Sequence, residues 1–212
     1  MSTRVTMIRH GQSTWNAIGR SQGQAPVPLS TLGHRQAAQT AQAVVQDGPI
    51  EAVYCSDLVR CRQTVAPLAD VVGLPVHYDV RLREVDVGTW QGLVWAEREA
   101  FDPDNYAAYI ANPMHVSFPG GESLHDMQVR VVAALKDILI AHPTGHVVIV
   151  THGGPIRAAL RHFGLWPYEF WAEDAPPVYN ASRTVLHFNG AEPVVEVVLM
   201  ADVSHLAVDA VT

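Results

Sequence analysis

The chain is poor in cysteine and has no long hydrophobic run. Cys55 and Cys61 are the only cysteines among 212 residues, and their spacing fits neither a zinc-ligand motif nor a redox motif. Two cysteines in a chain of this length do not make a disulfide framework, so we expect reduced thiols and a cytoplasmic location. No run approaches the roughly 18 apolar residues that a membrane-spanning helix needs. The first apolar stretch, residues 5–8, meets Arg9 and His10 too early for a signal peptide, so we expect no membrane partner.

Basic residues are also in deficit. The chain has 14 Lys and Arg residues against 21 Asp and Glu residues, which gives a net charge of -7 at pH 7. This balance argues against a general binder of nucleic acid or of anionic membranes, although it allows a local positive pocket. The hydrophobic fraction of 48% and the charged fraction of 17% are typical of a globular protein. The chain has no internal repeat and no break in composition, so we expect one domain over residues 1–212.

Short β-type runs alternate with longer helical patterns. This alternation predicts an α/β fold with a mostly parallel central sheet and helices on both faces. The expected strands are residues 5–8, 52–55, 76–78, 147–150, 185–188 and 194–199, with a turn at residues 189–190. Helices are expected after the N-cap residues Ser30 and Ser123, from Asp57 with a kink or restart at Pro67, and from the first-turn Pro155. Residues 95–119, rich in aromatic residues, Asp, Asn and Pro, are expected to form an insertion that acts as a lid.

Cationic side chains follow three of the expected strands. Arg9-His10-Gly11 comes after the first strand, Ser56 to Arg60 after the second, and Thr151-His152-Gly153-Gly154 after a buried central run. Ligands collect at the carboxyl ends of parallel strands, so these side chains should meet at one edge of the sheet. Arginine forks suit phosphate or carboxylate oxygens, and glycines together with a helix N-terminus let backbone N–H groups approach an anion. The pattern predicts a phosphoryl-binding pocket.

Two further groups would turn such a pocket into an active site. A histidine imidazole is nucleophilic near neutral pH and can accept a phosphoryl group covalently. The leaving alkoxide then needs a proton from a carboxylic acid, for which Glu84 and Asp86 are both candidates; their spacing does not choose between them. The other histidines show no metal-ligand spacing, so we expect no metal. Ser13 and Ser182 lack the surroundings of a serine nucleophile.

These motifs together resemble the histidine phosphatase superfamily, which has the phosphoglycerate mutase-like fold. The resemblance rests on their order and spacing along most of the chain, since a lone Arg-His-Gly would be weak. The matching segments are residues 9–16 (RHGQSTWN), 29–37 (LSTLGHRQA), 56–64 (SDLVRCRQT), 82–84 (LRE), 119–123 (PGGES) and 150–154 (VTHGG). Cys61 stands where relatives usually carry alanine, a change of one small residue for another.

The resemblance implies a role for each matching residue. His10 would become the phosphohistidine, and Arg9, Arg60 and His152 would hold the equatorial phosphoryl oxygens. Glu84 would give a proton to the leaving group and then act as the base for water. The remaining matches, which would line the phosphate or substrate, are Asn16, Gln22, Gly23 and Gly153. Arg62 competes with Arg60, although the family pattern places the ligand four residues after Ser56, and a plain helix-capping role is the alternative for Asn16.

The predicted activity is that of a histidine acid phosphatase-type phosphoric monoester hydrolase acting on a small phosphate ester, without a cofactor. A cofactor-dependent phosphoglycerate mutase is the alternative. Mutases of this family carry an Asn-Glu-Arg-x-Tyr-Gly run around the acid, whereas residues 82–88 here read LREVDVG, and the chain is shorter than typical mutases. A non-catalytic phosphate-binding regulatory domain is a third hypothesis, which the complete set of expected catalytic residues disfavours. The resemblance also implies a homodimer, and which ester is hydrolysed is beyond the sequence.

Overall fold

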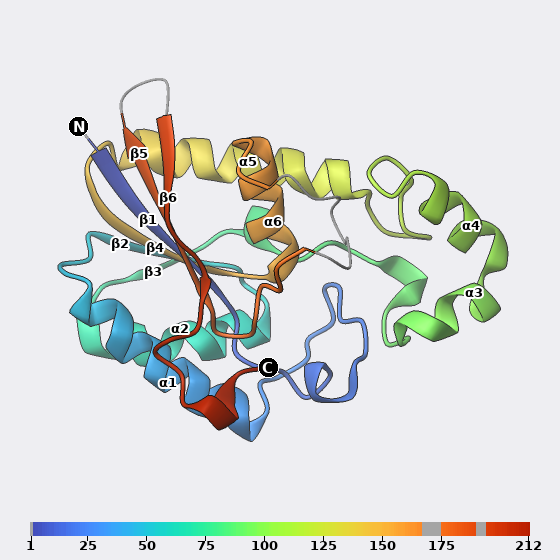
Figure 1. Ribbon diagram of the computed structural model, residues 1–212, viewed down its shortest axis with the longest axis horizontal. Helices are drawn as coiled ribbons and strands as arrows, with labels where there is room; N and C mark the ends of the chain where they lie inside the picture. Colours follow the sequence, from blue (N-terminus) through green and yellow to red (C-terminus); the bar gives the residue numbers. More distant parts are fainter. Residues whose placement is uncertain (1, 167–174, 190–193) are drawn as a thin grey trace.

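The computed structural model describes residues 2–166, 175–189 and 194–212, and its centre is a β-sheet (Figure 1). Six strands are present among the described residues, and all of them except β5 run in the same direction. The expected α/β fold with a mostly parallel sheet is therefore confirmed. The strand order across the sheet is β3 (Val76–Tyr78), β2 (Ala52–Cys55), β4 (Gly145–Thr151), β1 (Ser2–Arg9), β5 (Arg183–Asn189) and β6 (Val194–Asp202).

Helices cover both faces of the sheet. Figure 1 shows α1 (Thr31–Gln46) and α2 (Val59–Val72) on one side, and α5 (Leu124–Ala141) and α6 (Gly153–His162) on the other. The side chains of β4 divide between these layers because successive residues of a strand point to opposite faces. Val148 and Val150 pack into the cluster with α1 and α2, whereas Val147 and Ile149 pack into the cluster with α5 and α6. The alternation produces a three-layer core whose central strands are buried on both faces.

Local sequence signals fix where the helices begin and end. The Ser30 hydroxyl accepts a hydrogen bond from the Gly33 N–H, and Ser123 forms a capping box with Asp126 at the start of α5. Helix α2 continues through Pro67 and ends at Gly73, whose φ of 67° is in the left-handed region that favours glycine. The expected turn at residues 189–190 extends beyond the described residues.

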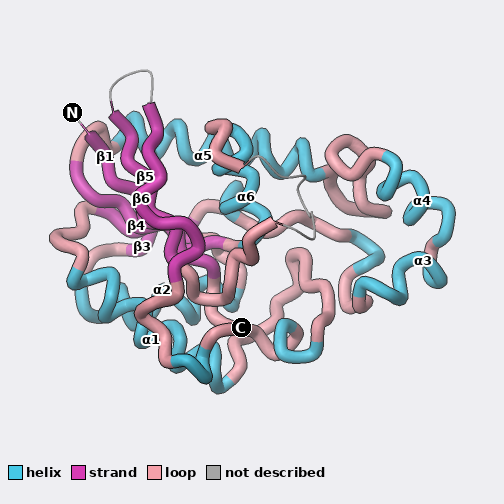
Figure 2. The backbone as a smooth tube through the Cα atoms, in the orientation of Figure 1, coloured by secondary structure: helices cyan, strands magenta, loops and turns pink. Residues whose placement is uncertain are grey.

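The segment from Trp95 to Pro119 projects away from the sheet (Figure 1). It contains η4 (Trp95–Glu97), α3 (Arg98–Phe101) and α4 (Pro103–Ala111). Its aromatic residues pack on Trp90, which is completely buried at the end of η3 (Gly88–Trp90). Figure 2 shows that the chain between β1 and α1 and the chain leading from β3 to α3 are mostly loop. The short helices in these segments are η1 (Asn16–Ile18), η2 (Val80–Leu82), η3 and η4, and η5 (Val208–Ala210) lies near the C-terminus.

Candidate active site

The register of the sheet brings His10 and His152 together. Arg9, the last residue of β1, pairs with Thr151, the last residue of the parallel neighbour β4. The next residue of each strand is a histidine, so both imidazoles emerge at the same edge of the sheet. Their ring centroids are 5.1 Å apart, and both residues are buried.

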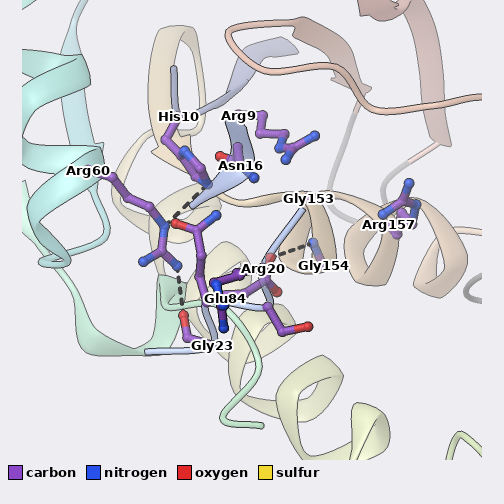
Figure 3. Close-up of a pocket in the computed structure, with 12 residues that line it drawn as sticks. Arg9, His10, Asn16, Arg20, Gly23, Arg60, Glu84, Gly153, Gly154 and Arg157 are labelled. Carbon is purple, nitrogen blue, oxygen red and sulfur yellow. Dashed lines mark hydrogen bonds between the residues drawn. The ribbon is translucent and has the colours of Figure 1, made fainter. Parts of the chain in front are cut away.

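Arg60 connects the two histidines. It lies in the first turn of α2, and its Nε is 3.2 Å from both His10 Nε2 and His152 Nδ1. Its two terminal nitrogens donate to the carbonyl oxygens of Gly23 and Ala25, which fixes the plane of the guanidinium (Figure 3). A guanidinium N–H can only donate, so both ring nitrogens that face it must be acceptors. The contact therefore requires both imidazoles to be neutral at these atoms.

The tautomer of His10 follows from its other ring nitrogen. His10 Nδ1 is 2.7 Å from the carbonyl oxygen of Gly11, and a carbonyl can only accept, so Nδ1 carries the hydrogen. The Nε2 lone pair is then directed at the Arg60 side of the pocket. Burial lowers the pKa of His10 well below its usual range, and the positive charges of Arg60 and Arg9 lower it further. His10 is consequently an uncharged imidazole at neutral pH, and its Nε2 lone pair accepts a hydrogen bond from Arg60.

His152 is buried like His10, and its pKa is shifted in the same direction. Burial lowers the pKa of His152 well below its usual range, with Arg60 as the next cause. Because Nδ1 accepts from Arg60, Nε2 carries the hydrogen and donates to Ser56 Oγ at 2.9 Å. The Cys61 thiol lies 3.4 Å from the same Nε2. These contacts fix the orientation of the ring behind Arg60.

Glu84 enters the site from the loop after η2 and is held by backbone groups. One carboxylate oxygen accepts the Val85 N–H at 2.9 Å, and the other accepts the Gly154 N–H at 3.2 Å. Gly154 lies at the N-terminus of α6, where backbone N–H groups have no partner within the helix. The carboxylate thus stands over the helix N-terminus, where the helix dipole favours a negative charge.

These groups surround a pocket of about 180 Å³ (Figure 3). The volume is below the roughly 300–1,000 Å³ of sites for drug-sized ligands, which favours a small ligand. Four of the lining residues are arginines and one is an acid, so the pocket is cationic although the chain is acidic. Burial lowers the pKa of Arg9 to about 10, still well above neutral pH. The lining residues are Arg9, His10, Asn16, Arg20, Ser21, Gln22, Gly23, Arg60, Glu84, Gly153, Gly154 and Arg157.

Eight of the nine residues expected at the site line this pocket, and the ninth, His152, lies behind its wall. Asn16 Oδ1 accepts hydrogen bonds from the Ser13 N–H and hydroxyl and from the Asn180 amide, so Asn16 organises the loop after β1 rather than capping a helix. Gln22 is buried, and its Oε1 has no hydrogen-bond partner among the described residues, which leaves this acceptor for a donor group of a ligand. Gly23 has a φ of 50° and presents its carbonyl to Arg60.

The structure separates two pairs of alternatives that the sequence left open. Glu84 lines the pocket, whereas Asp86 accepts the Gly88 N–H in the following turn and does not line it. Arg60 is buried at the site, whereas the Arg62 guanidinium stacks 3.9 Å from the Tyr78 ring centroid and donates to the Asp57 carbonyl. Trp95, the first residue of the expected lid, packs against Arg98 and does not line the pocket.

The expectation that Gly11 offers its N–H group to an anion is wrong. This N–H donates to Thr64 Oγ1 at 3.0 Å. A Cβ at position 11 would lie 2.6 Å from the carbonyl oxygen of Gly33. Glycine is therefore needed here because the loop after β1 packs tightly against the start of α1.

Sequence reasoning missed several residues at the site. Arg157 follows Gly153 by four positions, so it lies one helical turn along the same face of α6, and this spacing is a signal that the sequence contained. Arg20 and Ser21 reach the pocket through a loop that pairs with residues 92–94, and Asn180 comes from a distant segment. The positions of these three residues depend on tertiary contacts that no local sequence pattern indicates.

Neither a metal centre nor a membrane span is visible in the described parts of the chain. Within residues 2–166, 175–189 and 194–212, no three His, Cys, Asp or Glu side chains are grouped to hold a metal ion. None of the helices in those ranges is long and apolar enough to cross a bilayer. Cys55 and Cys61 are both free and buried.

In this α/β fold, a neutral histidine, arginines and a carboxylate meet near the ends of the strands. This arrangement is typical of proteins that bind phosphoryl groups. Residues 5–200 match the model of the histidine phosphatase superfamily (branch 1), and the chain belongs to that family. It is 34% identical to the metal-independent phosphoserine phosphatase of Arabidopsis thaliana over 207 residues, which cover 97% of this chain and 84% of that protein. It is 35% identical to phosphoglycerate mutase-like protein 4 of the same plant over 205 residues, which cover 95% and 86%.

A solved structure shows the same fold. A mycobacterial glucosyl-3-phosphoglycerate phosphatase, in a complex with VO3, superposes with a TM-score of 0.79 at 31% identity. The match covers 93% of this chain and 98% of that one. The resemblance inferred from the sequence motifs is thereby confirmed at the level of family and fold.

Proposed function

We propose that the protein is a metal-independent phosphatase that hydrolyses phosphomonoesters of small metabolites through a phosphohistidine at His10. The observation that carries this proposal is the neutral His10 imidazole, whose Nε2 lone pair faces a cationic pocket beside Arg60. The phosphatase names of relatives that align along nearly the whole chain support the same reaction.

In the first step, His10 Nε2 attacks the phosphorus atom of the ester. The N–P bond forms as the P–O bond to the alcohol breaks, and negative charge spreads over the three equatorial oxygens. Arg9 and Arg60 hold those oxygens, and His152, which does not line the pocket, positions Arg60 by accepting a hydrogen bond from its Nε. Glu84, which lines the same pocket, acts in its protonated form and passes that proton to the departing alcohol oxygen.

In the second step, water attacks the phosphohistidine. Glu84, now without its proton, removes a proton from the water as the new O–P bond forms and the N–P bond breaks. His10 Nε2 regains its lone pair, and phosphate leaves. Asn16, Gln22, Gly23 and Gly153 shape the space that the phosphoryl group occupies. No step in this scheme requires a metal ion.

The competing fates of the phosphohistidine can be separated experimentally. The protein is incubated in EDTA with p-nitrophenyl phosphate, and separately with 3-phosphoglycerate and 2,3-bisphosphoglycerate. We expect phosphate release from p-nitrophenyl phosphate in the presence of the chelator, and phosphate release from 3-phosphoglycerate that is faster than its isomerisation. Isomerisation that outpaces phosphate release would instead identify a mutase, and no turnover of any ester would identify a binding domain.

Three further features belong to this proposal. Residues 1–212 act as one domain in which the segment 95–119 moves as a lid, and the hydrogen bond from Arg98 of α3 to Ser21 links this segment to the pocket wall. The buried free thiols support a cytoplasmic enzyme. The homodimer implied by the family resemblance stays a prediction, which sedimentation equilibrium tests directly.

A further inference from the structure

The segment that carries Glu84 has little regular structure of its own. Residues 83–87 lie between η2 and η3, and none of them belongs to a helix or a strand. In such a segment the backbone carbonyl groups need hydrogen-bond donors from elsewhere in the protein. The place of the Glu84 side chain in the pocket therefore depends on what holds this backbone.

Arg130 of α5 supplies donors to three of these carbonyl groups. Its Nη1 donates to the carbonyl oxygen of Arg81 at 2.8 Å and to that of Arg83 at 2.7 Å. Its Nη2 donates to the carbonyl oxygen of Glu84 itself at 2.9 Å. A single side chain on a regular helix thus holds the backbone that leads to the acid.

Glu122 fixes the orientation of the Arg130 guanidinium. Its Oε2 accepts from Arg130 Nε at 2.9 Å, and its Oε1 accepts from Arg130 Nη2 at 2.6 Å. The same Oε1 accepts the Asp86 N–H at 2.9 Å, and the Glu122 N–H donates to the Asp86 carbonyl oxygen at 3.1 Å. Arg130 and Glu122 together therefore hold the backbone on both sides of Glu84.

These contacts use every donor that the Arg130 guanidinium has. An arginine side chain carries five N–H groups, of which three here go to backbone carbonyls and two to the Glu122 carboxylate. Arg81 provides a contrast within the same segment, because its guanidinium donates to the carboxylates of Asp79 and Asp137 instead. Arg81 links side chains at the surface, whereas Arg130 organises the backbone.

We infer that Arg130 is a positioning residue for the acid–base steps, because with Glu122 it holds the backbone that places the Glu84 carboxyl group at the leaving oxygen. The Glu84 carboxylate contacts the N–H groups of Val85 and Gly154, so a shift of the segment moves the carboxylate relative to the start of α6. A misplacement of about 1 Å can cost on the order of 100-fold in rate. This inference rests on the proposed phosphatase function, in which Glu84 is the acid.

The test compares two esters that differ in how much they need the acid. Phenyl phosphate and p-nitrophenyl phosphate share the ring and the phosphoryl group, but phenolate is the poorer leaving group and gains more from a proton. The ratio kcat/KM reports the transfer of the phosphoryl group to His10, so slow hydrolysis of the phosphohistidine does not mask the effect. In Arg130→Ala we expect kcat/KM for phenyl phosphate to fall roughly 10-fold further than that for p-nitrophenyl phosphate. A purely structural role would lower both values by the same factor.

Two further measurements separate positioning from folding. Guanidinium chloride, at a concentration that does not affect the wild type, should restore the phenyl phosphate activity of Arg130→Ala, because the free cation carries the deleted donors; sodium chloride should not. Arg130→Lys keeps the charge and the stem but lacks the planar fork, so it should show the same selective loss to a smaller extent. Arg130→Lys decides the question should Arg130→Ala fail to fold.

Arg81→Met is the matched control. It removes an ion pair between the same segment and Asp137 of α5, and it leaves the carbonyl groups that Arg130 holds in place, so the wild-type ratio for the two esters should remain. A wild-type ratio in the Arg130 variants, or an equal change in Arg81→Met, would overturn the inference while leaving the phosphatase function intact. Failure of the wild type to hydrolyse either ester would overturn both.

Discussion

The Glu84 carboxylate occupies the space that a side chain at position 154 would need. A Cβ built on Gly154 would lie 2.1 Å from Glu84 Oε1, while the Gly154 N–H donates to Oε2 of the same carboxylate. The glycine therefore does two things at once: it makes room for the acid, and it orients the acid with a backbone donor. A residue with any side chain at position 154 forces Glu84 to move.

This relationship predicts a specific defect in Gly154→Ala. The displaced carboxylate can no longer protonate the alcohol, so kcat for an alkyl phosphate should fall by about 100-fold, the scale of general acid catalysis. The loss should be much smaller for p-nitrophenyl phosphate, because p-nitrophenolate leaves readily without a proton. Glu84→Gln should show the same dependence on the leaving group. Equal losses on the two substrates in both variants would remove Glu84 from the role of acid.

The charge state of His10 gives a prediction for pH dependence. Burial, Arg60 and Arg9 all lower its pKa, so His10 should remain neutral as the pH falls through 6.5 and should take up a proton only well below that value. The ¹⁵N chemical shifts of the His10 ring, followed by NMR from pH 8 downward, report this directly. In Arg60→Gln the positive charge is gone, and the titration should move to higher pH. A wild-type midpoint near 6.5 would contradict this account of the nucleophile.

His146 should make the stability of the fold depend on pH. It lies at the start of β4, its Nε2 is 2.8 Å from Thr6 Oγ1, and burial lowers its pKa to about 4. The unfolded chain binds a proton at this residue as the pH falls through about 6.5, whereas the folded chain does so only near 4. The unfolded state therefore holds more protons in this window, so stability is lost as the pH falls from 6.5 toward 4.

His146→Gln removes this proton uptake. Between pH 7 and pH 5 the free energy of unfolding of the wild type should drop by about 2 kcal/mol more than that of the variant. Urea denaturation at both pH values measures the difference, and His146 is remote from the pocket, so activity at neutral pH serves as the control for correct folding. Parallel losses in the two proteins would show that His146 titrates normally in the folded state.

Arg98 should couple the insertion to the pocket. Its guanidinium lies 4.3 Å from the Trp95 ring centroid and 5.1 Å from that of Trp90, and it donates to the Ser21 hydroxyl. Arg98→Met keeps an apolar stem on the aromatic rings but removes the donor, so KM should rise several-fold with a smaller change in kcat. Hydrogen exchange in residues 95–119 should slow when phosphate binds to the wild type and respond less in the variant. An unchanged KM would argue against a lid.

Local signals in the sequence were sufficient for the elements that local physics determines. Ser30 and Ser123 marked the starts of α1 and α5 because a capping hydroxyl satisfies backbone N–H groups at close range. The strand at residues 52–55 was placed correctly because a short apolar run there has polar residues on both sides. The predicted ranges of β1 and β4 were too short by a few residues. Pairing with neighbouring strands, and not local composition, determines where these strands begin and end.

The sequence predicted the site residues that immediately follow strands, but it did not predict those that long loops contribute. His10 and His152 follow adjacent strands, and the general rule for parallel sheets places them together. The sequence could not choose between Glu84 and Asp86 as the acid, because only the turn at Gly88 directs the Asp86 carboxylate away from the pocket. Gly11 was misassigned because its close contact with Gly33 joins two segments that no pattern connects. Arg20 was missed for the same reason.

Trapping the covalent intermediate tests the central claim most directly. The wild-type protein is mixed with a ³²P-labelled ester in EDTA and quenched in alkali, which preserves phosphohistidine, and the labelled peptide is mapped by mass spectrometry. We predict acid-labile label on Nε2 of His10 that chases to phosphate, and no label in His10→Ala. Label on another residue, or label that persists in His10→Ala, would contradict the account.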